Sequence, residues 1–196
     1  MKKLLVLALF VLGSIVLADE PASEEDFSLH TLSIGSGIGI YIPTPKTWKP
    51  IKSADGRTIK FYSMNPNDPM SFKMTFIENI KQQRFSLDTV ADIVAKTAEQ
   101  YVSSSVEGEI NLYSLDTTLG KAVLAGFNDK KYQDVATIPP GEYSSVTTGL
   151  VPHSQVLVPL TILSNGTDSK ELEMARNVIS AFYVLKLPNK ASNPTP

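Results

Sequence analysis

The chain has 196 residues, 42% of them hydrophobic, and contains no cysteine. Its formal net charge of −2 argues against nucleic acid and anionic lipid as partners, because proteins that bind them carry an excess of basic residues. Without cysteine the chain has no disulfide, no thiolate metal ligand and no cysteine-linked lipid, so we expect a domain of this length to be stabilised by its core.

Residues 1–18 have the pattern of a signal peptide. Two lysines follow the initial methionine, an apolar run extends from Leu4 to Leu17, and Ala18 is a small residue suited to a cleavage site. The apolar run is shorter than the roughly 20 residues that a spanning helix needs. We therefore expect cleavage, a periplasmic or secreted product and no stable membrane insertion, with an uncleaved anchor as the alternative.

The remainder is expected to form one domain. Residues 19–33 begin with an acidic, proline-containing stretch and are interpreted as a flexible leader. Residues 34–187 carry the patterns of strands and helices without a repeat or an internal linker, and residues 188–196 form a polar tail that we expect to be disordered.

Hydrophobic periodicity predicts the elements of this domain. Ser86 is expected to cap one helix, and Thr167 or Asp168 to cap a second whose apolar stripe continues to Leu185. Pro159 interrupts the most apolar strand, so we expect a bulge or an edge position there. The predicted strands are 34–42, 57–64, 70–76, 106–115, 121–127, 143–151 and 156–163, and the first helix is 87–102.

These elements predict an α+β fold with a mostly antiparallel sheet of about six to seven strands. The isoleucine-rich first strand leading into Ile42-Pro43-Thr44-Pro45-Lys46-Thr47-Trp48, the helix at 87–102, the four strands after it and the closing helix with Ile179-Ser180-Ala181-Phe182 resemble the PsbP-like superfamily. That superfamily includes PsbP and DcrB-like bacterial envelope proteins. The resemblance implies helices packed on both faces of the sheet, an α/β/α sandwich. It also implies binding and assembly support without catalysis, and it transfers no functional residue.

Trp48, Tyr41 and Lys46 are the candidate binding residues. They belong to a stiff proline-rich segment, and rigid aromatic side chains often contribute much of the energy of a protein interface. In the other interpretation, which we favour, Trp48 folds back and covers the sheet as part of the core.

No catalytic, metal or cofactor site is predicted. His30 and His153 lack neighbours at ligand spacing. Glu107 and Glu109 would share one strand face, either as an acid–base pair or as ordinary solvated side chains. Gly35–Gly39 lacks the lysine of a phosphate-binding loop and is interpreted as the flexible start of a strand.

The sequence therefore favours a secreted or periplasmic, non-catalytic binding or assembly-support protein that acts through an envelope protein partner. A binder of a small ligand or metal is the first alternative. An enzyme of unrecognised type that uses Glu107 and Glu109 is the second.

Overall fold

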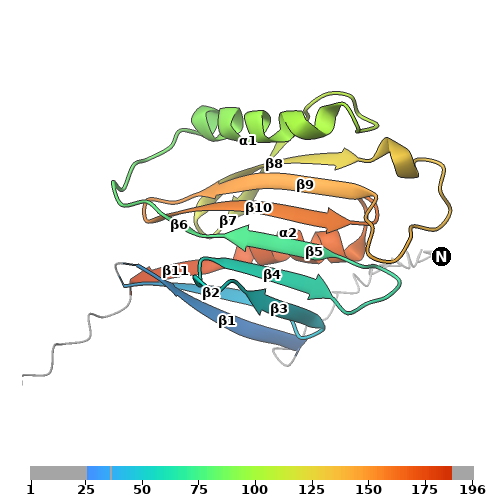
Figure 1. Ribbon diagram of the computed structural model, residues 1–196. Helices are drawn as coiled ribbons and strands as arrows, with labels where there is room; N and C mark the ends of the chain where they lie inside the picture. Colours follow the sequence, from blue (N-terminus) through green and yellow to red (C-terminus); the bar gives the residue numbers. More distant parts are fainter. Residues whose placement is uncertain (1–25, 36, 187–196) are drawn as a thin grey trace, which may run out of the picture.

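The computed structural model describes residues 26–35 and 37–186. The predicted signal peptide at 1–18, the start of the predicted leader and the predicted tail at 188–196 lie outside the described residues. The described part of the chain forms a larger antiparallel sheet, a three-stranded sheet and two α-helices (Figure 1). The predicted α+β class is confirmed, whereas the three-stranded sheet was not predicted.

The larger sheet contains eight strands. Seven of them follow one another in the order β3-β4-β5-β10-β9-β8-β7, and the short β6 pairs with β10 in line with β5. All of these pairs are antiparallel. The bounds are β3 Trp48–Lys52, β4 Thr58–Ser63, β5 Ser71–Thr75, β6 Ile77–Glu78, β7 Leu112–Thr117, β8 Gly120–Asn128, β9 Ser145–Pro152 and β10 Val156–Ser164.

The three-stranded sheet has the order β1-β2-β11. β1 (Phe27–Ile34) and β2 (Ile38–Pro45) form a hairpin, and Gly37 has the positive φ of 69° that a tight turn requires. The prediction of a flexible leader over 19–33 is therefore wrong for 27–33. Those residues are ordered because β1 pairs with β2 along its whole length and buries Leu32 and Ile34.

The helix α1 (Leu87–Val102) begins where the sequence predicts. The Ser86 hydroxyl accepts a hydrogen bond from the Thr89 amide at 3.2 Å, which satisfies one of the unpaired amides at the helix N-terminus. Val90, Val94 and Ala98 lie on one side of the helix and are buried against β8 and β9.

The helix α2 (Lys170–Ala181) differs from the prediction at both ends. Ser169 caps it in place of Thr167 or Asp168, with its hydroxyl 3.1 Å from the Leu172 amide. The helix stops at Ala181, and the next residues form β11 (Tyr183–Lys186), which pairs with β2. Leu185, expected on the buried helical stripe, is therefore 50% exposed.

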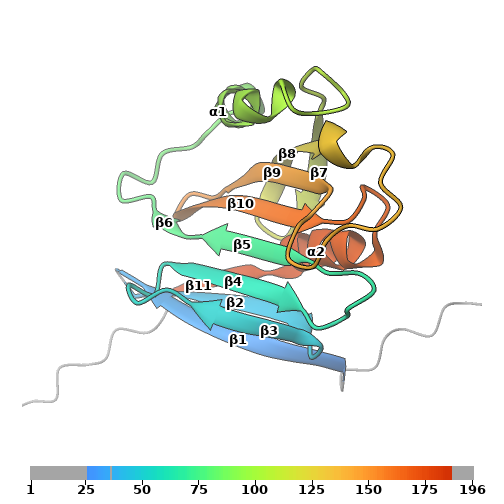
Figure 2. The same cartoon turned by 45° about the vertical axis from the view of Figure 1, so that its right-hand side comes forward.

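The core lies on both faces of the larger sheet. On one face, α2 and the inner side of the three-stranded sheet enclose the larger cluster, to which Ala122 and Leu124 of β8 belong. On the other face, α1 packs on Val123 and Ala125. Figure 2 shows α1 and the three-stranded sheet on opposite sides of the molecule. Because α1 packs on one face of the larger sheet and α2 on the other, the prediction of helices on both faces is confirmed.

Pro159 lies inside a central strand without a bulge. The pairing register is the same on its two sides, Leu157 with Ile77 and Leu160 with Met74, so no residue is inserted. The ladder with β5 and β6 skips Val158 and Pro159, consistent with the missing proline N–H. The predicted bulge or edge position is therefore wrong.

Candidate binding surface on the three-stranded sheet

Trp48 is the first residue of β3 and lies in the core. Its side chain is 3% exposed, its indole N–H donates to Glu171 Oε2 at 2.5 Å, and its ring packs against Phe61 and Phe72. The structure thus agrees with the interpretation of Trp48 as a core residue. Glu171 of α2 is itself buried, and this bond gives its carboxylate a partner.

Tyr41 and Lys46 do not form a cluster with Trp48. Tyr41 points away from the core on the outer side of β2, where its ring stacks on Tyr183 with 5.0 Å between centroids and 7° between planes. Lys46 is exposed in the turn between β2 and β3. Their role in binding stays a prediction. Of the two, Tyr41 lies on the outer side of β2, which belongs to the candidate surface described next.

The outer side of the three-stranded sheet is an exposed apolar surface, which we call the aromatic face and define by Phe27, Leu29, Tyr41, Pro43, Tyr183 and Leu185. Directly paired residues share a face, which joins Leu29 to Pro43 and Tyr41 to Tyr183. Leu29 is 56% exposed, Leu185 50%, Phe27 44% and Tyr183 36%. Contiguous exposed apolar side chains often mark a site of interaction.

The outward positions of this sheet carry no charged side chain. Besides the aromatic face they hold only small or uncharged residues, namely Thr31, Ser33, Gly39 and Pro45. Charged residues are depleted and aromatic residues enriched at the centres of protein interfaces. The aromatic face has that composition.

A groove of about 320 Å³ adjoins the aromatic face. It is lined by Phe27, Pro43 and Pro45 from the sheet and by Met174, Asn177 and Ala181 from α2. No sequence pattern predicts this groove, because its two walls lie about 130 positions apart in the chain and come together only when α2 packs on β2.

The two histidines make structural contacts. His30 faces inward from β1, with Nε2 at 2.9 Å from Thr44 Oγ1 and its ring beside Phe61. Burial, and secondly the charge of Lys52, lower the pKa of His30. His153 Nδ1 accepts from the Gln155 amide at 3.3 Å, and burial lowers the pKa of His153.

Glu107 and Glu109 do not share a strand face, because β7 begins only at Leu112; that prediction is wrong. The Glu107 carboxylate accepts from the backbone amide of Asn128 at 3.0 and 3.1 Å and from Asn128 Nδ2 at 3.0 Å. Glu107 therefore fastens a loop to the end of β8.

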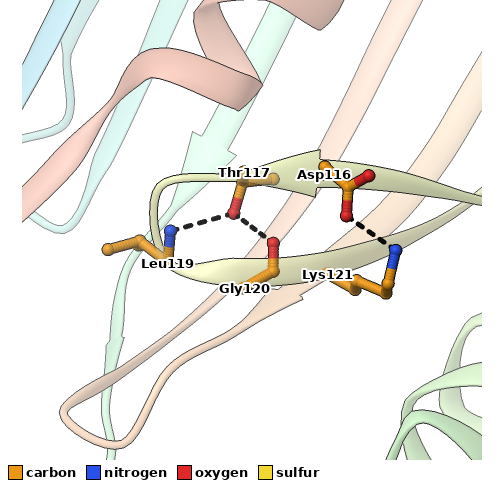
Figure 3. A network of polar contacts seen from close by, with 5 residues as sticks. All are labelled: Asp116, Thr117, Leu119, Gly120 and Lys121. Carbon is orange, nitrogen blue, oxygen red and sulfur yellow. Dashed lines mark hydrogen bonds and ion pairs between the residues drawn. The ribbon is translucent and has the colours of Figure 1, made fainter.

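A second hollow, of about 450 Å³, lies beside the β7–β8 turn and is lined in part by Arg84, Lys121 and His153. Figure 3 shows the polar contacts of this turn: Thr117 Oγ1 donates to the Gly120 carbonyl and accepts from the Leu119 amide. Lys121 is paired with Asp116 at 2.6 Å in an exposed ion pair. This hollow lacks a buried polar group that would fix a ligand.

Within the described residues, no group of three or more histidine, aspartate or glutamate side chains is arranged to hold a metal ion. Two acidic side chains in loops accept hydrogen bonds from backbone amides: Asp68 from the amide of Glu171, and Asp129 from that of Lys131.

No family model and no curated protein sequence matches the chain. Among solved structures, the chain is similar to LpqN, described as involved in cell envelope biogenesis of Mycobacterium tuberculosis. The TM-score is 0.42 and the identity 14%, over 81% of this chain and 91% of LpqN. No helix in the described part of the chain is long and apolar enough to cross a membrane.

Proposed function

We propose that this protein is an extracytoplasmic, non-catalytic binding protein of the PsbP-like type that engages a protein partner through the aromatic face. The exposed, uncharged outer side of the three-stranded sheet is the observation that carries the proposal. The signal-peptide pattern of residues 1–18 supports a location outside the cytoplasm.

The shape of the surface favours a protein over a small molecule. Sites for small molecules usually enclose most of the ligand's surface. The aromatic face instead extends over three strands, with Leu29 on β1 and Leu185 on β11 separated by the width of β2. A partner that presents apolar or aromatic side chains matches it, and the groove beside Phe27 can receive one of them.

Site-specific photo-cross-linking in the native envelope tests this proposal. A photoreactive side chain at Leu185 should give an adduct with one partner, while the same group at Glu99, exposed on α1 on the other side of the molecule, should not. Tyr183→Ser should reduce the adduct formed from Leu185 without lowering the melting temperature by more than a few degrees. Equal adducts from both positions, or none from Leu185, would contradict the proposal.

An apolar small ligand in the groove is the second candidate, because Met174, Ala181 and the prolines form apolar walls. Displacement of an apolar fluorescent dye by an alkyl chain would support it. The dye should then bind less well to the Ala181→Phe variant, which fills the groove, than to Glu99→Ala. Binding that is equal in both variants would exclude the groove as the site.

A further inference from the structure

The free edge of β1 differs from the other sheet edges in the described part of the chain. Edge strands expose unpaired backbone groups, and proteins usually protect them with charges, proline or short length. Of the strands at the ends of the two sheets, β3 has Lys49, Pro50 and Lys52, β7 has Asp116, and β11 has four residues ending in Lys186. β1 has eight residues with neither a charge nor a proline.

The backbone groups that β1 leaves free can be assigned. Pro43 and Pro45 stand opposite Leu29 and Phe27, and proline has no N–H to donate, so these are the non-hydrogen-bonded pairs of the hairpin. The backbone groups of residues 27, 29, 31 and 33 consequently point away from β2. The Thr31 carbonyl fits this assignment, because it accepts a hydrogen bond of 2.9 Å from Lys52 Nζ on β3.

This edge is complementary to itself. In an antiparallel pair of β1 strands centred on His30, Phe27 of one copy stands opposite Ser33 of the other, and Leu29 stands opposite Thr31. All four residues with free backbone groups then meet each other, and each large side chain lies beside a small one. Such a contact is twofold symmetric and closes after two copies.

We propose that two copies of this chain pair through their β1 edges to form a continuous six-stranded sheet. Lys52 competes with this pairing, because its ammonium occupies the Thr31 carbonyl in the single chain. The pairing places two aromatic faces side by side, and it does not depend on the proposed function.

Sedimentation of the purified protein over a wide concentration range tests the pairing. Thr31→Pro removes the free N–H on each copy without removing a bond to β2, so it should weaken dimerisation about tenfold or more. Thr31→Val keeps the N–H and should leave the dimer intact. Lys52→Met releases the Thr31 carbonyl and should tighten the dimer about fivefold.

Amide hydrogen exchange gives a second measurement that needs no variant. Exchange at residues 27, 29, 31 and 33 should slow as the protein concentration rises, while exchange in β3 should not change. A monomer at every concentration for both the native protein and Lys52→Met would overturn the proposal, as would equal dissociation constants for folded Thr31→Pro and Thr31→Val. Leu185 cross-linking reports on the partner separately, because Leu185 lies at the opposite edge of the sheet.

Discussion

The two sides of the three-stranded sheet are both apolar but have opposite surroundings. The inner side carries Leu32, Ile34 and Ile40, none more than 6% exposed, and it packs on the larger sheet. The outer side carries Leu29 and Leu185, each at least 50% exposed. Hydrophobicity alone therefore does not decide which side is buried; the position of the larger sheet and of α2 does.

The largest effect is expected on the inner side. Ile40→Ala should lower the free energy of unfolding by about 2–5 kcal/mol, because Ile40 is fully buried and the rigid surroundings leave a cavity. Leu29→Ala, the matched change on the outer side, should alter it by about 0.5 kcal/mol or less. Urea unfolding of the two variants measures both. Comparable losses would mean that the outer side is also covered in solution.

A smaller effect is expected where β3 meets α2. Trp48→Phe removes the indole N–H that reaches the buried Glu171 carboxylate, at a cost of about 1–3 kcal/mol. Glu171→Gln retains an acceptor oxygen of similar size and should cost less. Thermal unfolding compares the two variants, and a Trp48→Phe protein as stable as the native one would show that the bond contributes nothing.

The smallest effect is expected in the dependence of folding stability on pH. Burial holds the pKa of His30 and of His153 below the ordinary value of about 6.5, so the unfolded chain binds more protons than the folded one as the pH falls below that value. The stability is fully present above this pH and declines as the pH falls through the lowered values. His30→Gln should reduce the loss on acidification, and His30→Gln with His153→Gln should reduce it further. Equal pH profiles for all three proteins would refute this.

The sequence predicted α1 because local signals determine it, namely a serine cap and apolar residues at helical spacing. It missed β1 for a physical reason. The outer positions of β1 run from Phe27 to Ser33, apolar to polar, while the inner positions run from Ser28 to Ile34, polar to apolar. Neither side of β1 is therefore apolar along its whole length, so its residues lack the regular alternation of apolar and polar side chains that indicates a strand.

The candidate surface was predictable only in part. Tyr41 was singled out from its proline-rich neighbourhood, but its stacking partner Tyr183 was assigned to a helix. The run Phe182–Leu185 is rich in the aromatic and β-branched residues that favour strands, which was the available signal. The groove and the burial of Glu171 depend on α2 packing against distant strands, and no local pattern reports such packing.

The pairing of β11 with β2 has a kinetic consequence. Tyr41 and its neighbours cannot complete their sheet until Tyr183, about 140 positions later, has reached them. Contacts between such remote segments close slowly, because the intervening chain must first lose its freedom. In a polypeptide that emerges gradually from its N-terminus, the β1–β2 hairpin can form early, but the three-stranded sheet stays incomplete until β11 arrives.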